Sequence, residues 1–270
     1  MALLELKNAG KSYGTREVLA NVNLSVEEGE FVSIVGASAS GKTTLLKIAA
    51  GLVQPDRGGA FVGGERTNAF PGRASIVFQN YSLLPWLSAM ENVLLAVESA
   101  FPEWPAIRRK EQASRYLQLV GLGAALAKRP SQLSGGMRQR VAIARAFAVE
   151  PRVLFLDEPF GALDALTRAT LQQELAKLCQ TQQPAATALM ITNSVDEAIL
   201  LSDRILALGH GPGASLSPAV AVPFPRPRPF DLMTHNEDAV HIRGHLTGFL
   251  ASRGRRATAK KQPESEPVVA

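Results

Sequence analysis

The feature that most constrains this chain is a glycine-rich segment at residues 36–43, Gly-Ala-Ser-Ala-Ser-Gly-Lys-Thr, which fits the pattern GxxxxGK[ST]. It follows an apolar run at residues 31–35 and precedes residues 43–50, where apolar side chains recur at helical spacing. Backbone N–H groups in such a turn, and at the start of the following helix, point at phosphate oxygens. Lys42 supplies a charge for the outer phosphates and Thr43 a hydroxyl for Mg²⁺. The segment predicts a phosphate site between a buried strand and a helix.

Two adjacent carboxylates, Asp157 and Glu158, follow a continuous apolar run at residues 153–156. Ligands of open parallel sheets bind at the carboxyl ends of the strands, so this pair is expected beside the phosphate loop. Asp157 is suited to the Mg²⁺ shell, and Glu158 is suited to polarise a water for in-line attack on a γ-phosphate. The alternative is a charged pair that simply faces solvent at the end of a strand.

Strand-like apolar runs alternate with helical patterns, which predicts an α/β fold: a P-loop NTPase core whose sheet is mainly parallel and covered on both faces. Short strands before residue 31 predict an N-terminal antiparallel β portion. Helical patterns at about 85–135 predict a helical lobe inserted into the core, within a domain of residues 1–215. Proline-rich residues 216–230 predict an extended linker, and residues 231–270 a short helix and a basic tail.

The net charge of +5, from 29 basic and 24 acidic residues, invites a nucleic-acid hypothesis, but its distribution argues against one. Residues 1–217 hold 21 basic and 19 acidic side chains, so the main body is close to neutral. A single cysteine, Cys179, excludes an intrachain disulfide and suits a reducing compartment. The uncharged stretch 205–225 is broken by glycine and proline, so we expect an intracellular protein that does not itself span a membrane.

Residues 133–140, Leu-Ser-Gly-Gly-Met-Arg-Gln-Arg, begin a third helical pattern that continues to residue 147. Ser134 and two glycines leave the N–H groups at the start of this helix unobstructed, which makes a second anion site. Here the sequence resembles the signature of the ATP-binding cassette (ABC) ATPase family, whose motifs it carries in order over about residues 1–210. The resemblance implies that two subunits sandwich two ATP molecules, so that Ser134 of one subunit caps the γ-phosphate held at Lys42 of the other.

The resemblance implies a site with ATP and Mg²⁺ as cofactors. The ATP-binding residues are Tyr13, which stacks on adenine, and Gly36, Ala37, Ser38, Ala39, Ser40, Gly41, Lys42, Thr43 and Thr44. The Mg²⁺ ligands are Thr43, Gln79 and Asp157, and the catalytic residues are Glu158, Gln79 and Asn193. The residues that contact the ATP of the partner subunit are Ser134, Gly135, Gly136 and Gln139. Asp164 lies in a loop that crosses the dimer interface. For Tyr13 the alternative is an ordinary surface tyrosine.

The sequence departs from the family pattern at Asn193, where the family has a histidine that contacts the γ-phosphate. The four histidines all lie at residue 210 or later, so no neighbour replaces it. Asparagine donates an amide hydrogen bond but carries no charge and relays no proton. We therefore hypothesise that ATP binds normally while hydrolysis is slow, or that the protein pairs with a second cassette whose own site is intact.

Residues 78–86, Phe-Gln-Asn-Tyr-Ser-Leu-Leu-Pro-Trp, are similar to the corresponding segment in the ATP-binding subunits of importers of nitrate, alkanesulfonates, taurine and related small solutes. This narrower resemblance implies that Leu83, Leu84 and Trp86 form an apolar contact for membrane-spanning permease subunits, with internal packing as the alternative. It also implies a peripheral location on the cytoplasmic face of the inner membrane, a periplasmic solute-binding protein as an indirect partner, and no nucleic acid. A non-transport cassette ATPase and an ATP-sensing module that does not hydrolyse remain alternatives; the sequence does not name the solute.

Overall fold

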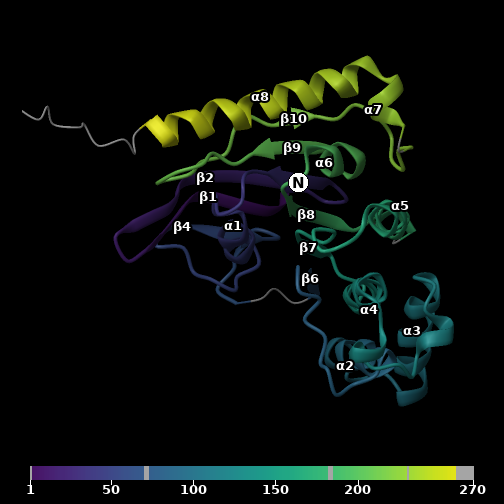
Figure 1. The fold of residues 1–270 in the computed structure, drawn as a ribbon. Helices are drawn as coiled ribbons and strands as arrows, with labels where there is room; N and C mark the ends of the chain where they lie inside the picture. The colour runs from purple at the N-terminus through teal and green to yellow at the C-terminus, as the bar shows by residue number, and fades with distance from the viewer. Residues whose placement is uncertain (1, 70–72, 182–184, 230, 260–270) are drawn as a thin grey trace, which may run out of the picture.

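The computed structural model describes residues 2–69, 73–181, 185–229 and 231–259, so most of the predicted basic tail lies outside the described residues. The described residues form two β-sheets with helices packed around them and a group of helices set apart at one side (Figure 1). This arrangement confirms the predicted α/β class with its antiparallel portion and its separate helical lobe.

The smaller sheet is antiparallel and has the order β2-β1-β4-β5. Its strands are β1 (Ala2–Tyr13), β2 (Arg16–Glu27), β4 (Arg57–Val62) and β5 (Glu65–Arg66). Alternating apolar residues of β2, such as Val22, Leu24 and Val26, point into the core while their neighbours face outward. β1 and β2 pair as a hairpin as far as Tyr13 and Arg16, beyond the buried apolar residues Ala9 and Leu19.

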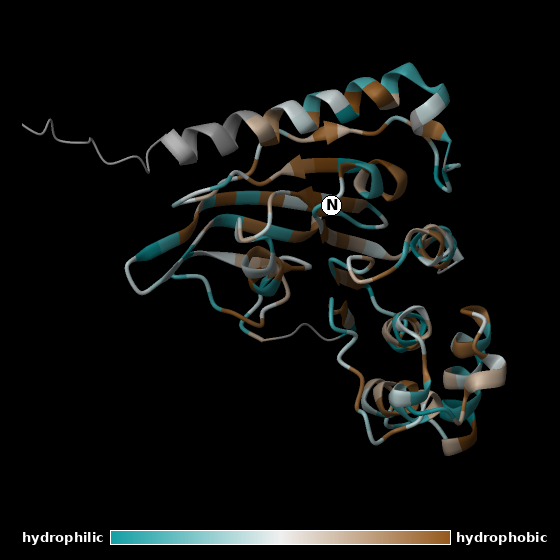
Figure 2. Cartoon of the chain, in the orientation of Figure 1, coloured by the Kyte–Doolittle hydropathy of each residue, from teal (hydrophilic) through white to brown (hydrophobic). Residues whose placement is uncertain are grey.

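The larger sheet has the order β10-β9-β3-β8-β7-β6, and all its strands are parallel except the edge strand β10. Its strands are β3 (Phe31–Val35), β6 (Ala74–Val77), β7 (Val153–Asp157), β8 (Thr187–Thr192), β9 (Arg204–Ala207) and β10 (Val220–Ala221). Every residue of β3, β7 and β8 is buried, as continuous apolar strands covered on both faces require. Figure 2 shows these central strands as largely hydrophobic.

Helices flank both sheets and build the lobe. The helices that follow strands of the core are α1 (Lys42–Ala49), α5 (Ala165–Thr181) and α6 (Val195–Leu201). The lobe consists of α2 (Ala89–Ala100), α3 (Ala106–Leu119), the 3₁₀ turns η1 (Gly123–Ala125) and η2 (Pro130–Gln132), and α4 (Gly135–Ala148). Ser88 begins α2 with a reciprocal capping box to Glu91, which fixes where the lobe starts.

The segment predicted as an extended linker is extended, but it lies against the core. Its strand β10 pairs with β9, and the backbone then forms α7 (Leu232–His235) and α8 (Glu237–Ala259). Helix α8 runs along the β9–β10 edge (Figure 1), with Ile242 and Leu246 in a cluster that also holds Ala198 and Ile199 of α6. Within the described ranges, none of the helices is long and apolar enough to cross a membrane.

Candidate functional site

The glycine-rich segment forms a tight turn between β3 and α1, as predicted. Ala39 and Gly41 have φ angles of 60° and 104°, in the left-handed region, which turns the backbone around an open centre. A Cβ on Gly36 would lie 2.9 Å from Ser40 Oγ and 3.3 Å from the Leu208 carbonyl, so only glycine leaves this backbone unobstructed. Gly41 lies against Val18 at the start of β2, which places the β1–β2 hairpin beside the loop.

The chemistry of this turn fits phosphate oxygens. Gly41 has no side chain with which to cap α1, and the first intrahelical hydrogen bond runs from Leu45 N to Gly41 O. The N–H groups of Lys42, Thr43 and Thr44 therefore have no acceptor within the helix. Among the residues that the structure describes, the buried Ser40 hydroxyl has no hydrogen-bond partner either. A set of unsatisfied donors at the positive end of a helix dipole is suited to bind an anion.

Lys42 lies at the centre of the site with its side chain buried. Its ammonium donates to the carbonyls of Gly36 and Ala37, both at 3.0 Å, and to Asn193 Oδ1 at 2.7 Å. Glu158 Oε1 lies 3.4 Å from the same nitrogen. Burial lowers the pKa of Lys42, and the nearby Glu158 carboxylate partly offsets this effect. A partly desolvated cation of this kind gains from a phosphate that brings negative charge.

Asp157 ends β7 and lies beside the phosphate loop, as predicted. Its Oδ1 accepts a hydrogen bond of 3.3 Å from the Thr43 hydroxyl, which joins β7 to α1. Burial raises the pKa of Asp157, and a bound divalent cation would reverse this effect because it stabilises the carboxylate. In the part of the chain that the structure describes, no group of three His, Cys, Asp or Glu side chains could hold a metal. A hydroxyl, one carboxylate and phosphate oxygens are instead the oxygen ligands that Mg²⁺ prefers.

Glu158 follows Asp157 and adopts a φ angle of 44°, which turns its side chain out of the strand direction toward the loop. Gln79, just after β6, donates from Nε2 to Glu158 Oε2 at 3.4 Å. Because β6 and β7 are adjacent parallel strands, their carboxyl ends bring these two residues together. The glutamate has one oxygen near Lys42 and the other near Gln79, a position from which it could orient and deprotonate a water.

Asn193 lies at the carboxyl end of β8, within hydrogen-bond distance of Lys42. An ammonium only donates, so the asparagine must turn its carbonyl oxygen toward Lys42 and keep its NH₂ group for another partner. The two flanking residues are held in place: Thr192 Oγ1 donates to Glu197 at 2.6 Å, and the Ser194 hydroxyl accepts from Glu197 N at 3.2 Å. Burial raises the pKa of Glu197.

The segment at residues 133–140 begins α4, with the Ser134 hydroxyl accepting from Met137 N at 3.2 Å as an N-cap. Around the two glycines, a Cβ on Gly135 would meet the Tyr81 hydroxyl and a Cβ on Gly136 would meet Thr167. These neighbours belong to the Gln79 loop and to α5, not to the phosphate loop. Just before α5, the Asp164 carboxylate accepts from Thr167 N at 3.0 Å and so caps the helix.

Gln139, a predicted contact to the ATP of the partner subunit, is buried in α4. Its side chain is fully buried, and neither amide atom has a hydrogen-bond partner among the described residues. It is buried because it lies on the face of α4 that also carries Ala142 and Ile143, toward the lobe core. The predicted contact of Gln139 with the nucleotide of a partner subunit remains a prediction, and it would require this buried side chain to become accessible.

Two predicted contact residues are exposed. Tyr13 is 52% exposed at the tip of β1, with the Lys11 ammonium 5.7 Å from its ring centre. Trp86 is 64% exposed on the lobe, whereas Leu83 packs partly against the lobe core. The apolar contact expected at Leu83, Leu84 and Trp86 remains a prediction. Trp86 is the side chain of the three most available for it, and the packing of Leu83 agrees with the alternative of internal packing.

The family model described as "ABC transporter" matches residues 19–161, which include the phosphate loop, the signature segment and Glu158. The chain is 43% identical to the nitrate import ATP-binding protein NrtD of Synechococcus elongatus, over 90% of its own length and 90% of NrtD. The chain belongs to the ABC transporter family. This membership confirms the resemblance drawn from the motifs, including the narrower likeness to nitrate importers.

Other relatives of this ABC cassette carry bicarbonate transport in their names. It is 43% identical to the bicarbonate transport ATP-binding protein CmpD of Synechocystis sp., covering 93% of this chain and 90% of CmpD. It is 50% identical to CmpC of the same organism over 73% of this chain, but spans only 29% of CmpC. A dimeric post-hydrolysis structure of the ATP-binding cassette MJ0796 with ADP and Pi matches with a TM-score of 0.73 and 33% identity, covering 82% of this chain and 99% of that one.

Two arginines of α4 connect the cassette's lobe to the loop after Gln79, although the sequence motifs assign them no role. Arg145 of α4 donates to the carbonyls of Tyr81 and Ser82, and Arg138 lies 5.4 Å from the Tyr81 ring. These contacts tie the loop after Gln79 to the signature helix, so the phosphate site and the lobe are physically connected. Arginines at i and i+7 on α4 would have been the only sequence signal for this connection.

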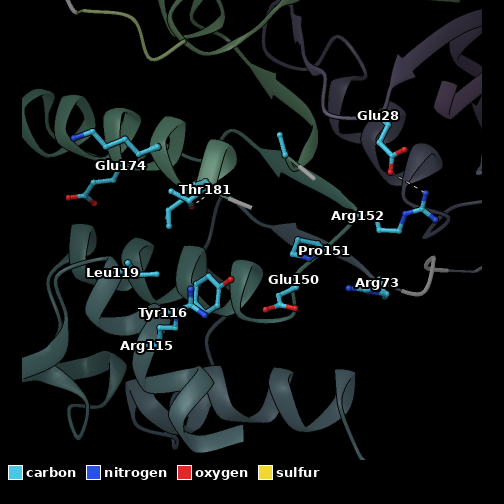
Figure 3. Close-up of a pocket in the computed structure, with 13 residues that line it drawn as sticks. Glu28, Arg73, Arg115, Tyr116, Leu119, Glu150, Pro151, Arg152, Glu174 and Thr181 are labelled. Carbon is cyan, nitrogen blue, oxygen red and sulfur yellow. Dashed lines mark hydrogen bonds and ion pairs between the residues drawn. The ribbon is translucent and has the colours of Figure 1, made fainter. Parts of the chain in front are cut away.

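The cassette also has a cavity of about 770 Å³ away from the phosphate site (Figure 3). Its walls come from α3, from the C-terminal part of α5 and from residues that precede the core strands, such as Arg73 before β6 and Arg152 before β7. The phosphate loop, Asp157 and Asn193 lie at the opposite, carboxyl ends of the strands. The cavity is therefore separate from the nucleotide site. Arg152 is paired with Glu28 across its upper rim at 3.3 Å.

Proposed function

We propose that this protein is the ATP-binding and ATP-hydrolysing subunit of an importer for a small anion. The observation that carries the proposal is the convergence of Lys42, Glu158 and Asn193 on one open phosphate loop. The nitrate and bicarbonate transport named for its relatives supports a small anion as the solute, which membrane-spanning permeases and a solute-binding protein would select. The subunit would then lie peripherally on the cytoplasmic face of the inner membrane.

Each of the residues at the site would have a distinct role in the reaction. Backbone N–H groups of the loop and Lys42 would hold the β- and γ-phosphates, and Tyr13 on the neighbouring hairpin would stack on adenine. Mg²⁺ held by Thr43, Asp157 and Gln79 would neutralise charge on the phosphates. Glu158, oriented by Gln79 on one side and Lys42 on the other, would take a proton from the attacking water.

The site is incomplete in one subunit. The N-terminus of α4, with its Ser134 cap and two glycines, is a second anion site whose closest neighbours are Tyr81 and Thr167. A second copy that turned this helix end toward the phosphate loop would supply donors to the γ-phosphate. Asp164 caps the helix that begins next to it, and Thr167 of that helix lies against Gly136. The dimeric state of the solved cassette MJ0796 supports this arrangement. We infer a dimer that ATP closes and hydrolysis opens.

ATP-driven dimerisation of a Glu158→Gln variant tests this function. The substitution removes the base and keeps the shape, so we expect ATP to stay uncleaved and the dimer to accumulate in light scattering. A matched Glu158→Gln/Ser134→Arg variant places a bulky side chain at the second anion site and should remain monomeric with ATP. A Glu158→Gln protein that stayed monomeric with ATP would contradict the proposal.

Asn193 supports a second candidate, a slow cassette that works as one half of a heterodimer. Synechococcus elongatus has both NrtC and NrtD named as nitrate import ATP-binding proteins, and this chain matches each at 43–45% identity. In such a pair, a site without the charged histidine would bind ATP while the other site turned over. Phosphate release by the purified protein alone distinguishes this candidate from an active homodimer.

A further inference from the structure

The proline-rich segment before α8 is fastened to the core by two arginines. Arg226 forms two hydrogen bonds with the Asp203 carboxylate, at 2.9 and 2.8 Å, and Asp203 also accepts from Phe31 N at 2.8 Å. Two residues later, Arg228 is only 3% exposed. The proline-rich segment has the composition of a solvated linker, but these contacts hold it in one position against the core.

Arg228 directs its guanidinium to backbone carbonyls. Its Nη1 donates to the carbonyls of Ile199 and Ser202, the latter at 2.7 Å, while Nε and Nη2 donate to the Phe224 carbonyl of its own segment. Ile199 lies in the last turn of α6, and Ser202 is its C-cap. The last carbonyls of a helix have no partner within it and form the negative end of its dipole, so the buried Arg228 cation caps the C-terminus of α6.

The cap stabilises α6, because this helix is too short to be stable on its own. Seven residues give a length of about 10 Å, and isolated helices of this size are unstable in water. Burial lowers the pKa of Arg228 to about 10, so it remains charged at neutral pH. Helix α8 adds a second support, with Arg243 Nε 2.9 Å from Asp196 Oδ1 in the first turn of α6.

The other end of α6 leads directly to the phosphate site. Ser194, its N-cap, follows Asn193, and Ser194 N donates to Thr192 Oγ1 at 3.0 Å. Glu197 on α6 is bound by Thr192 and by Gln172 of α5. Thr192 is held in the sheet by its pairing with Val35, so a displacement of α6 would act on Asn193, which lies between Thr192 and the N-cap Ser194, and would shift it relative to Lys42. The loop between β3 and α1 would keep its own contacts.

We propose that Arg228 is a positioning residue for ATP hydrolysis: by capping α6 it holds Asn193 against Lys42, and the C-terminal extension is a brace for the γ-phosphate end of the site. The proposal rests on the proposed ATPase function for its kinetic consequence. Its structural consequence, a rigid α6, does not depend on that function.

The test compares Arg228→Met with Arg226→Met. Both remove one arginine from the same segment, but only Arg228 contacts α6. In hydrogen exchange of the ligand-free proteins, we expect the amides of residues 193–201 to exchange about tenfold faster in Arg228→Met, with the phosphate loop unchanged. Arg226→Met should lower the unfolding temperature without this local effect. Equal exchange of residues 193–201 in the wild type and Arg228→Met would overturn the proposal.

Kinetics gives the second readout. We expect Arg228→Met to lower kcat about tenfold with little change in the KM for ATP, because it misplaces Asn193 and not the loop that binds the nucleotide. In an Asn193→Ala background the same substitution should have no further effect on kcat; independent, multiplicative losses would overturn the role in positioning. If Arg228→Met does not fold, the exposed Arg243→Ala variant replaces it, with smaller changes in the same direction. A wild type without phosphate release would refute the active homodimer, while the exchange experiment would still decide on the brace.

Discussion

Lys42 donates a hydrogen bond of 2.7 Å to Asn193 Oδ1, which joins the turn after β3 to the end of the neighbouring strand β8. The cation is thus shared between the two loop carbonyls, the asparagine and Glu158 before any phosphate arrives. The amide NH₂ of Asn193 is left as a neutral donor for the γ-phosphate. Asn193 therefore keeps a hydrogen bond to the phosphate loop in place of the family histidine. Because it carries no charge, we expect it to limit the rate of ATP hydrolysis.

Asn193→His should raise the rate of hydrolysis. A histidine at this position is longer and can carry a positive charge, so it should stabilise the charge that develops on the γ-phosphate. We expect kcat to rise at least about tenfold, toward the 10²–10³ that one lost transition-state donor costs. Asn193→Ala, as the matched control, should lower kcat below the wild type. Equal steady-state turnover of the wild type and Asn193→His in a phosphate-release assay would refute the idea of an impaired site.

Asp157→Asn should stabilise the ligand-free protein. Burial raises the pKa of Asp157, so at neutral pH the folded state bears the cost of a charge that the unfolded state solvates freely. We expect the variant to unfold a few degrees higher, on the order of 2–4 °C per kcal/mol for a domain of this size. As the pH falls toward 3.8, the carboxylate is protonated and the difference should vanish.

Mg²⁺ and ATP should reverse this order. The wild type should gain thermal stability from the nucleotide with the metal, and Asp157→Asn should gain much less because it has lost a negatively charged ligand. Thermal scans with and without Mg²⁺ and ATP, at pH values from neutral to acid, measure both effects. A ligand-free variant less stable than the wild type at neutral pH would show that the site does not penalise this charge.

The two glycines of α4 should respond differently to alanine. A Cβ on Gly136 would lie 2.5 Å from Thr167 Cγ2, so Gly136→Ala should displace α4 from α5 and lower the unfolding temperature. Thr167→Ser removes that methyl group and should restore most of the loss. A Cβ on Gly135 would meet only the Tyr81 hydroxyl at 3.4 Å, so Gly135→Ala should keep the fold and weaken only ATP-dependent dimerisation in light scattering. If both variants unfolded at the same temperature, the packing explanation for Gly136 would fail.

Trp86→Ala should separate the subunit from its membrane partner while leaving the enzyme intact. The indole is 64% exposed and is not among the side chains that pack in the hydrophobic cluster of the lobe, so its removal should change neither the unfolding temperature nor phosphate release by the isolated protein. An exposed aromatic of this kind contributes strongly when an interface buries it. We expect reconstituted transport and ATPase stimulation by the permease to fall at least about tenfold. Unchanged transport would remove Trp86 from the interface.

The sequence was sufficient to predict the local geometry of the candidate site because its motifs are local. The phosphate loop, the Asp157–Glu158 pair and the Ser134 cap each occupy a few consecutive residues at the boundary of a strand or helix, where the backbone alone fixes their geometry. The rule that ligands collect at the carboxyl ends of parallel strands then brings the separate segments together.

Contacts between distant segments could not be predicted in the same way. The alternation of proline and arginine at residues 225–229 indicated an extended backbone, but not that Arg228 would turn inward to carbonyls of α6, since that depends on how β10 pairs with β9. The burial of Gln139 follows from which face of α4 meets the lobe core, and the position of Arg145 beneath the loop after Gln79 depends on the same packing. Periodicity locates such faces, but it does not say what covers them.

The central claim is that one catalytic site requires Lys42 from one subunit and Ser134 from another, and mixing two inactive variants tests it most directly. Lys42→Ala disables the phosphate loop, and Ser134→Arg blocks the second anion site; each alone should release no phosphate above background. When they are mixed, random pairing makes about half of the dimers mixed, and each mixed dimer has one intact site. We predict that phosphate release returns on mixing, to about a quarter of the wild-type rate or less. Full activity of either variant alone, or no recovery in mixtures shown to contain the mixed dimer, would contradict the claim.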